Sequence, residues 1–298
     1  MKVKNRLYKR NDDFNLICKF LCENYKHNNK DGNWFQATWE YMYCHPNSNE
    51  NLLDKICIWE NSDEIVGIVN HEGELGEAFF QIHPDYNHLK TEMLEYAENA
   101  LFGKTNKGDK YLRVYINDFD KEFEQIVRSS GYTIDDKYNR PMSQYIIPEQ
   151  FPEIRLPEGF KLKSLQEDND LNKVNRILWR GFNHSGEPPT EDLEGRRKMQ
   201  SAPNFRKDLN IVVENPPGNF ISYCGMWYDN TNKIAYVEPV ATDPDYRRRG
   251  FGKIAVLEGI KRCAEFGATV AYVGSEQKFY QTLGFEKIYT SRCWLKYL

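Results

Sequence analysis

The residues best suited to chemistry lie in the last third of the chain. The segment 240–253, VATDPDYRRRGFGK, joins an expected strand to an expected helix. The first N–H groups of a helix lack intrahelical partners and, with the helix dipole, attract an anion. Gly250 and Gly252 remove side chains there, so a pyrophosphate could approach the backbone. The same pattern also fits a solvent-exposed basic turn with capping glycines.

Two motifs together resemble the GNAT superfamily, the Gcn5-related N-acetyltransferases. The family pattern [RQ]-x-x-G-x-[GA] is matched by Arg247, Gly250 and Gly252. About 30 residues later the family commonly has F-Y-x-x-x-G-F, which is matched by the segment FYQTLGF at 279–285. Thr242 stands where the family often has Val, and GSE at 274–276 replaces a common Asn-x-x-Ala lead-in. The match covers roughly residues 160–298.

The resemblance implies direct transfer of an acetyl group from acetyl-CoA to an amine, with no metal. It implies a binding segment for acetyl-CoA, with backbone N–H groups around Val240, Ala241 and Thr242 reaching the pantetheine and the thioester oxygen. The phosphates would be held by Arg247, Arg248, Arg249, Gly250, Phe251, Gly252 and Lys253.

Glu238 is the candidate base. An amine attacks only when neutral, so a base, or a water held by one, must take its proton. Strict alternation along the strand would put residues 236, 238, 240 and 242 on one face. A carboxylate within the apolar stretch IAYVEPVA needs an explanation, because an unpaired buried charge is costly. Pairing with a nearby Arg or Lys, or a solvent-exposed face, would also explain it.

Tyr280 is the candidate acid. When CoA thiolate leaves, a phenol with an ordinary pKa near 10 is close enough to a thiol near 8.5 to donate a proton. The alternative is a packed aromatic residue at a helix end, as its neighbour Phe279 is expected to be.

The spacing of apolar residues predicts an α/β fold with the same element order twice. HPDY at 83–86 returns as DPDY at 243–246, Gly67 is matched with Gly225, and Gly131-Tyr132 with Gly284-Phe285. Helices are expected at 13–25, 89–101, 121–130, 170–182, 250–266 and 276–283. Strands are expected at 55–60, 64–70, 77–82, 111–116, 210–214, 219–227, 233–241, 269–273 and 286–298.

These repeats predict two tandem GNAT-like domains, a degenerate non-catalytic one at 1–150 and a catalytic one at 151–298. Three prolines between 148 and 157 mark an extended connector. Counted from the shared Pro-Asp-Tyr, Lys90 and Glu92 replace Gly250 and Gly252. Counted from the shared glycine, Val127 replaces Tyr280. We therefore expect one CoA for each chain.

Composition narrows the classes of partner. Residues 1–150 carry a net charge of −7 and residues 151–298 of +3, which suits a small anion better than nucleic acid. No apolar stretch approaches the roughly 20 residues of a membrane helix, and the first residues lack the apolar core of a secretory signal. Seven scattered cysteines indicate neither disulfides nor a zinc site, which favours the cytoplasm.

The acceptor is left open by the sequence as a small-molecule or peptide amine. A non-catalytic CoA-binding or interaction protein is the alternative from another class. Transfer of a larger acyl or aminoacyl group is a third possibility, since some tandem-domain relatives do this.

Overall fold

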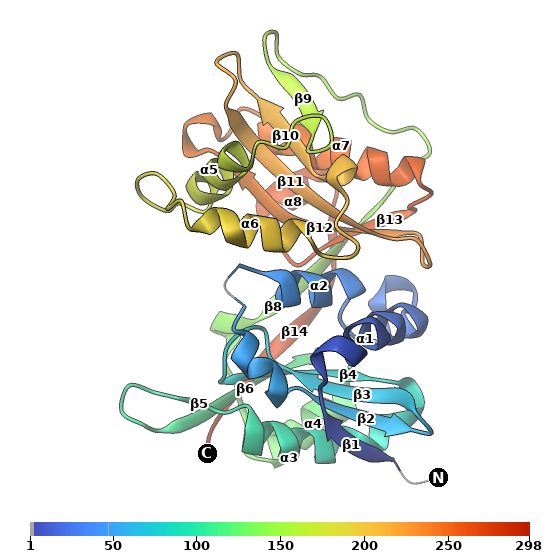
Figure 1. The fold of residues 1–298 in the computed structure, drawn as a ribbon. Coiled ribbons are helices and arrows are strands. Elements are labelled where there is room, and N and C mark those ends of the chain that lie inside the picture. Colours follow the sequence, from blue (N-terminus) through green and yellow to red (C-terminus); the bar gives the residue numbers. More distant parts are fainter. Residues whose placement is uncertain (1–2, 47) are drawn as a thin grey trace. The chain divides into compact units, whose positions relative to one another are not determined.

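The structure, a computed structural model, describes residues 3–46 and 48–298 and divides into two compact units (Figure 1). Unit 1 takes the described residues within 1–43, 47–142 and 287–298, and unit 2 takes 44–46 and 143–286. Both units are mixed α/β, as the sequence predicts. The division differs from the expected boundary at 150/151, because two strands near the ends of the repeats lie in units other than those expected.

Unit 2 contains a sheet with the strand order β8-β13-β12-β11-β10-β9. The strands are β8 (Arg140–Ile146), β9 (Lys161–Ser164), β10 (Ile211–Glu214), β11 (Phe220–Asp229), β12 (Ile234–Thr242) and β13 (Val270–Val273). Four neighbouring pairs are antiparallel, and only β12 and β13 run parallel. The helices are α5 (Leu171–Gly181), α6 (Asp192–Gln200), α7 (Phe251–Glu265) and α8 (Lys278–Leu283).

The two faces of this sheet carry different helices. Alternating strand residues send Val212 and Tyr223 to one face, where they pack with α5, and Ile211 and Cys224 to the other, where they pack with α7 and α8. The side chain of Asp170 starts α5 by accepting hydrogen bonds from the N–H groups of Asn172 and Lys173. The strands that reach the candidate site are therefore covered by α5 on one face and by α7 and α8 on the other.

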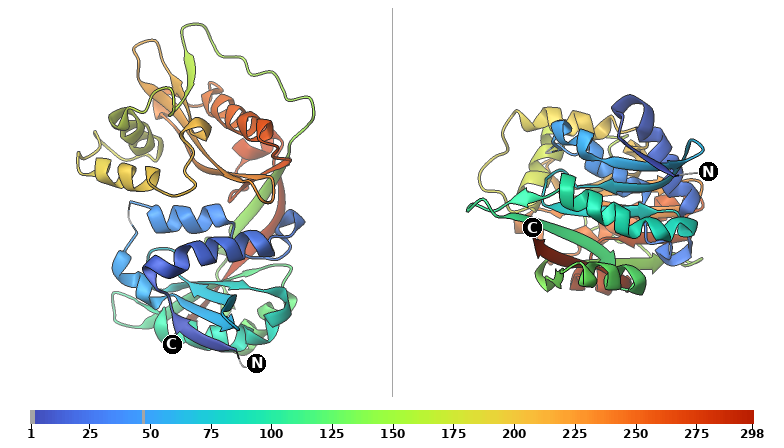
Figure 2. Two further views of the ribbon diagram at one scale, coloured as in Figure 1. Left: turned by 45° about the vertical axis from the view of Figure 1, so that its right-hand side comes forward. Right: turned by 90° about the horizontal axis from the view of Figure 1, so that it is seen from below.

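Unit 1 repeats this plan with the strand order β1-β2-β3-β4-β6-β14. Its strands are β1 (Lys4–Leu7), β2 (Cys57–Asn61), β3 (Glu64–Asn70), β4 (Glu77–Ile82), β6 (Lys110–Asn117) and β14 (Glu286–Tyr297), with short β5 (Gly103–Lys104) on β6 and β7 (Thr133–Ile134) on β14. Helices α1 (Arg10–Asn24) and α2 (Gln36–Cys44) pack on one face, and α3 (Lys90–Ala100) and α4 (Lys121–Ser129) on the other (Figure 2).

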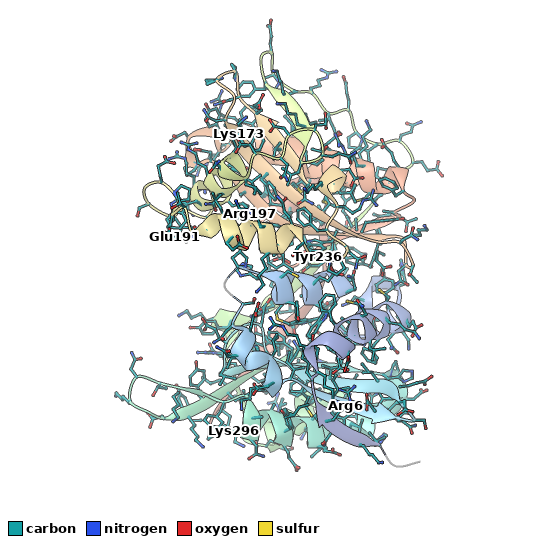
Figure 3. All side chains as sticks on the ribbon, in the orientation of Figure 1. Arg6, Lys173, Glu191, Arg197, Tyr236 and Lys296 are labelled. Carbon is teal, nitrogen blue, oxygen red and sulfur yellow. The ribbon has the colours of Figure 1, made fainter. Side chains whose placement is uncertain are left out.

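The last strand of each repeat lies in the sheet of the other unit. Residues 291–297 of β14, from the second repeat, pair antiparallel with β6 of unit 1. Residues 143–146 of β8, from the first repeat, pair antiparallel with β13 of unit 2. Lys296, labelled in Figure 3, adds an ion pair of 2.7 Å to Glu98 of α3. Each sheet is therefore completed by a strand that the other half of the sequence supplies.

The expected elements of both repeats are present, with ends shifted by a few residues. The sequence missed β1, β5, β7, β8, β9, α2 and α6. The tyrosines of the repeated Pro-Asp-Tyr make the same kind of hydrogen bond in both units. Asn61 Nδ2 donates to Tyr86 Oη at 2.6 Å, and Asn215 Nδ2 donates to Tyr246 Oη at 2.9 Å. One expected landmark was wrong. Gly67 faces Ile82, just before His83, whereas the residue facing Thr242, just before Asp243, is Ser222 rather than Gly225.

Candidate active site

The loop between β12 and α7 has the geometry of an anion site. Gly250 is the N-cap of α7 with a φ of 89°, a left-handed conformation that glycine adopts without strain. No side chain caps this helix, and the first helical hydrogen bond runs from Ile254 N–H to Gly250 C=O. The preceding N–H groups of the first turn are therefore available to a ligand.

Gly252 brings the start of α7 against the end of β12. A Cβ atom at this position would lie 2.9 Å from Thr242 Oγ1 and 3.3 Å from Phe279 Cζ. Neither distance leaves room for a side chain without displacing a neighbour. The close approach packs the loop, the end of β12 and the first residues of α8 together, so the loop and Tyr280 lie in neighbouring elements.

The basic residues of the loop take different positions. Arg247 donates from Nε to Thr242 C=O at 3.1 Å and from Nη2 to Gly181 C=O at 2.8 Å, so it fastens the loop to β12 and α5. Arg249 stacks over the rings of Tyr246 and Phe251. Arg248, with a φ of 61°, and Lys253 are exposed. Arg247 and Arg249 thus contact the protein, whereas Arg248 and Lys253 extend their charges into solvent.

A buried ion pair that the sequence did not reveal also holds this loop. Asp243 is only 3% exposed and accepts two hydrogen bonds from Arg180 of α5, at 2.6 and 2.9 Å. Burial alone would raise the pKa of Asp243, but Arg180, the Asp245 N–H and the charge of Arg176 hold it below its usual value. An Arg on α5 followed by an Asp 63 residues later carries no local signal, so only the fold shows the pair.

Glu238 lies in a β-bulge. Cys224 of β11 pairs with Val240 and Met226 pairs with Val237, so both Glu238 and Pro239 face the single residue Gly225. The bulge breaks the alternation that was expected from 236 to 242. Ala235 and Val237 pack on the α7 face, which puts Tyr236 on the other face, yet beyond the bulge Thr242 touches the start of α7. Tyr236 and Thr242 therefore lie on opposite faces.

The sheet opens next to this bulge. The parallel register of β12 with β13 covers three pairs and ends at Tyr236, which is labelled in Figure 3, opposite Tyr272. Among the described residues, 237–242 of β12 have no register partner in β13. Backbone groups around Val240 and Ala241 therefore have an edge free of β13, and Ala241 packs its side chain with α5. Such an edge can hydrogen-bond an extended ligand.

Tyr280 is brought to the same place by α8. Its ring is 9% exposed and packs edge-on against Phe279 and Phe285. Its pKa is raised by burial first, then by the neighbourhood of Cys224 and by the negative charge of Glu238. The fold thus brings the Tyr280 phenol within electrostatic range of the Glu238 carboxylate, although the two residues are 42 positions apart in the sequence.

The corresponding positions of unit 1 are filled by other contacts. Lys90 is buried, with its Nζ bonded to Asp120 and Glu122 at 2.9 Å each. Glu92 accepts a hydrogen bond from the Trp59 indole at 2.8 Å. A 3₁₀ turn (Pro84–Leu89) runs directly into α3, so the Lys90 N–H donates to Asn87 C=O instead of facing a ligand. Where Tyr280 would be, Val127 is buried in the core.

Three further observations concern the described residues, 3–46 and 48–298. No helix among them is both long and apolar enough to cross a membrane. They contain no cluster of His, Cys, Asp and Glu suited to a metal ion. None of the seven cysteines is in a disulfide bond.

Comparison with known proteins finds a family match for part of the chain. Residues 171–285, the segment that holds the loop, the bulge and Tyr280, match the model of the acetyltransferase (GNAT) family. This segment belongs to the GNAT family. The GNAT segment is also the part of the chain in which both expected motifs lie.

Curated relatives are similar over part of their length. A mycothiol acetyltransferase of Saccharomonospora viridis is 27% identical over 164 residues, 50% of this chain and 53% of the relative. An uncharacterized N-acetyltransferase of Methanocaldococcus jannaschii is 30% identical over 92 residues, 28% of this chain and 41% of the relative. The chain spans about half the length of these relatives.

Solved structures share the fold along the whole chain. A tandem GNAT protein from the clavulanic acid biosynthesis pathway aligns with a TM-score of 0.66 at 11% identity, covering 99% of this chain and 98% of its own. A GCN5-related N-acetyltransferase from Sphaerobacter thermophilus aligns at 0.61 and 14% identity, covering 99% and 95%. Both repeats therefore have the GNAT fold, in a tandem arrangement.

Proposed function

We propose that this protein is an acetyl-CoA-dependent N-acetyltransferase that moves an acetyl group directly to a primary amine. The observation that carries the proposal is the meeting of three features at one opening in the sheet of unit 2. They are the uncapped start of α7, the bulge with Glu238, and the phenol of Tyr280. A CoA thioester and an amine need an anion site, a base and an acid, and these features supply them.

Acetyl-CoA fits the residues at the start of α7 and along the end of β12. Its pyrophosphate would accept hydrogen bonds from the N–H groups of Gly250–Lys253, where Gly252 leaves only backbone. Arg248 and Lys253 would add positive charge, and Arg247 would hold the loop in shape. The pantetheine would run along 240–242, whose strand edge is free of β13. A backbone N–H there would stabilise negative charge on the thioester oxygen.

The chemistry needs two proton transfers. The amine nitrogen forms a bond to the acetyl carbonyl carbon, and its proton passes to Glu238, directly or through water. The carbon–sulfur bond then breaks, the electron pair leaves with sulfur, and the CoA thiolate takes a proton from Tyr280. Return of the proton from Glu238 to Tyr280 through solvent restores both groups. The products are the amide and CoA thiol, so protons and electrons balance.

The environment of Tyr280 links the two transfers. Burial and the charge of Glu238 raise the pKa of Tyr280, which keeps the phenol protonated before reaction. When Glu238 accepts the amine proton, its negative charge disappears and this contribution to the pKa disappears with it. Tyr280 therefore becomes a stronger acid at the stage at which the thiolate needs a proton.

We assign catalysis to unit 2 and a non-catalytic role to unit 1. In unit 1 the Lys90 and Glu92 side chains hold internal contacts, and the Lys90 N–H donates to Asn87 C=O at the start of α3. The acceptor is a small-molecule or peptide amine, and neither nucleic acid nor a membrane is required as a partner. Seven cysteines outside any disulfide bond suit a reducing compartment, and we propose the cytoplasm.

Release of CoA thiol from acetyl-CoA, measured against a panel of amines and corrected for hydrolysis, tests the proposal. We expect amine-dependent release and a product heavier by one acetyl group in mass spectrometry. Tight CoA binding without turnover would instead favour a binding protein. Preference for a longer acyl-CoA over acetyl-CoA would leave the assignment of the active site intact and replace acetyl-CoA as the proposed donor.

A further inference from the structure

The carbonyl group of Glu238 is held by a tryptophan from the neighbouring strand. In a β-bulge the extra residue loses its regular ladder partner, so its backbone groups need other partners. Here the indole N–H of Trp227 on β11 donates to Glu238 C=O at 3.1 Å. This contact gives the carbonyl of the proposed base a side-chain donor in place of a ladder bond.

The same carbonyl is confined on a second side by Gly225. A Cβ atom at Gly225 would lie 2.5 Å from Glu238 O and 2.9 Å from Pro239 Cδ, so the peptide that follows Glu238 lies directly over the glycine. Pro239 has no N–H and a fixed φ, which further limits the conformations of this peptide. The direction of the Glu238 Cα–Cβ bond follows from the orientation of its backbone.

Trp227 is itself rigid. It is 4% exposed, sits opposite Tyr236 in the β11–β12 register, and packs edge-on against Phe205 with ring centroids 6.0 Å apart. A buried indole N–H usually has an acceptor, which a purely apolar core position would not offer. In this chain that acceptor is the bulge carbonyl and not a carbonyl of the regular ladder.

We propose that Trp227 is a positioning residue that sets the orientation of Glu238 toward the amine through the main chain of the bulge. The proposal rests on the proposed function of Glu238 as the base. Trp227 does not touch the reacting atoms in this scheme. Its contribution is to fix the main chain from which the Glu238 carboxylate extends.

The test removes the indole N–H with the least change of shape. Trp227 is replaced by 3-benzothienylalanine, in which sulfur takes the place of the N–H, and separately by Phe. Loss of one hydrogen bond to a buried carbonyl should lower kcat/KM about tenfold in the isostere. The dissociation constant of acetyl-CoA should change less than about twofold, because the phosphate loop is untouched. Trp294→Phe, at a buried tryptophan of unit 1 whose indole N–H has no partner, is the matched control and should retain wild-type rate.

A double-mutant cycle decides whether Trp227 acts through Glu238. In a Glu238→Gln background the isostere should lower the rate by less than about twofold, since the base is already lost. The same fold-loss in both backgrounds, or an isostere with wild-type rate and pH profile, would overturn the proposal while leaving the acetyltransferase activity intact. A wild-type protein that transfers no acetyl group to any amine would overturn both.

Discussion

In the proposed mechanism, the proton transfers are divided between the half-buried carboxylate of Glu238 at a bulge and the buried phenol of Tyr280 at a helix end. Each depends on neighbours that are distant in the sequence. Glu238 is held through Gly225 and Trp227, and Tyr280 through Phe279 and Phe285. Substitutions that keep shape and remove only the proton-transfer group are therefore informative at this scale.

Glu238→Gln should lower kcat/KM about 10²-fold at neutral pH, the scale of a lost general base. Acetyl-CoA affinity should be nearly unchanged, because the phosphate loop does not use this side chain. The defect should shrink at high pH, where the amine loses its proton unaided. A pH series of initial rates measures this, and an unchanged rate at neutral pH would remove Glu238 from the mechanism.

Tyr280→Phe should slow turnover by about 10–10³-fold while keeping the ring packing with Phe279 and Phe285. The variant should unfold at a temperature close to that of the wild type, which differential scanning calorimetry can show. If activity were lost only together with a large drop in melting temperature, Tyr280 would be a structural residue.

At the scale of elements, the start of α7 depends on the absence of a side chain at Gly252. Gly252→Val should abolish acetyl-CoA binding, since its side chain would meet Thr242 and Phe279 and move the loop. Isothermal titration calorimetry measures the loss. Glu92→Val, at the corresponding position of unit 1, is the control and should leave binding intact.

The loop after β3 contains a buried histidine that should make unit 1 sensitive to acid. His71 Nδ1 accepts from Gly73 N–H and Nε2 donates to Leu52 C=O, so the neutral ring is the form that fits. Burial lowers the pKa of His71 below its usual value of 6.5, against opposing contributions from Leu52 and Asp54. Below pH 6.5 the unfolded chain takes up a proton that the folded chain does not, so stability falls.

Urea denaturation at pH 7 and pH 5 should show this loss of unfolding free energy. His71→Gln should reduce the difference between the two pH values. A wild-type protein whose stability is independent of pH over this range would contradict the assignment of a lowered pKa.

The sequence predicted the elements well, because their apolar periods and the glycines at helix ends are local signals. Placement of the candidate loop and of Tyr280 followed from local motifs in the same way. The bulge at Glu238 was missed, although Pro239 inside IAYVEPVA is a local signal for one, because proline cannot donate a ladder hydrogen bond. Arg180–Asp243 was also missed, since an ion pair across 63 residues depends on the approach of α5 to β12.

At the scale of the whole molecule, the two units have the same fold and different local chemistry at corresponding positions. We predict that each chain binds one acetyl-CoA. Lys90 and Glu92 make internal contacts in unit 1, so displacing them for a pyrophosphate would break two ion pairs and a partly buried hydrogen bond. Calorimetric titration of the intact chain should give a stoichiometry near one, and two comparable sites would contradict the assignment.

The exchange of terminal strands has a consequence for biosynthesis. Domains usually fold in order as they leave the ribosome, at about 5–20 residues per second. Unit 1 lacks β14 until residues 287–298 are translated, after the whole of unit 2 has emerged. For about 10–30 s its strand β6 has an unpaired edge, the kind of edge that recruits wrong partners. Nascent chains of this protein should therefore need chaperones for a longer time than a single domain of the size of unit 1 would.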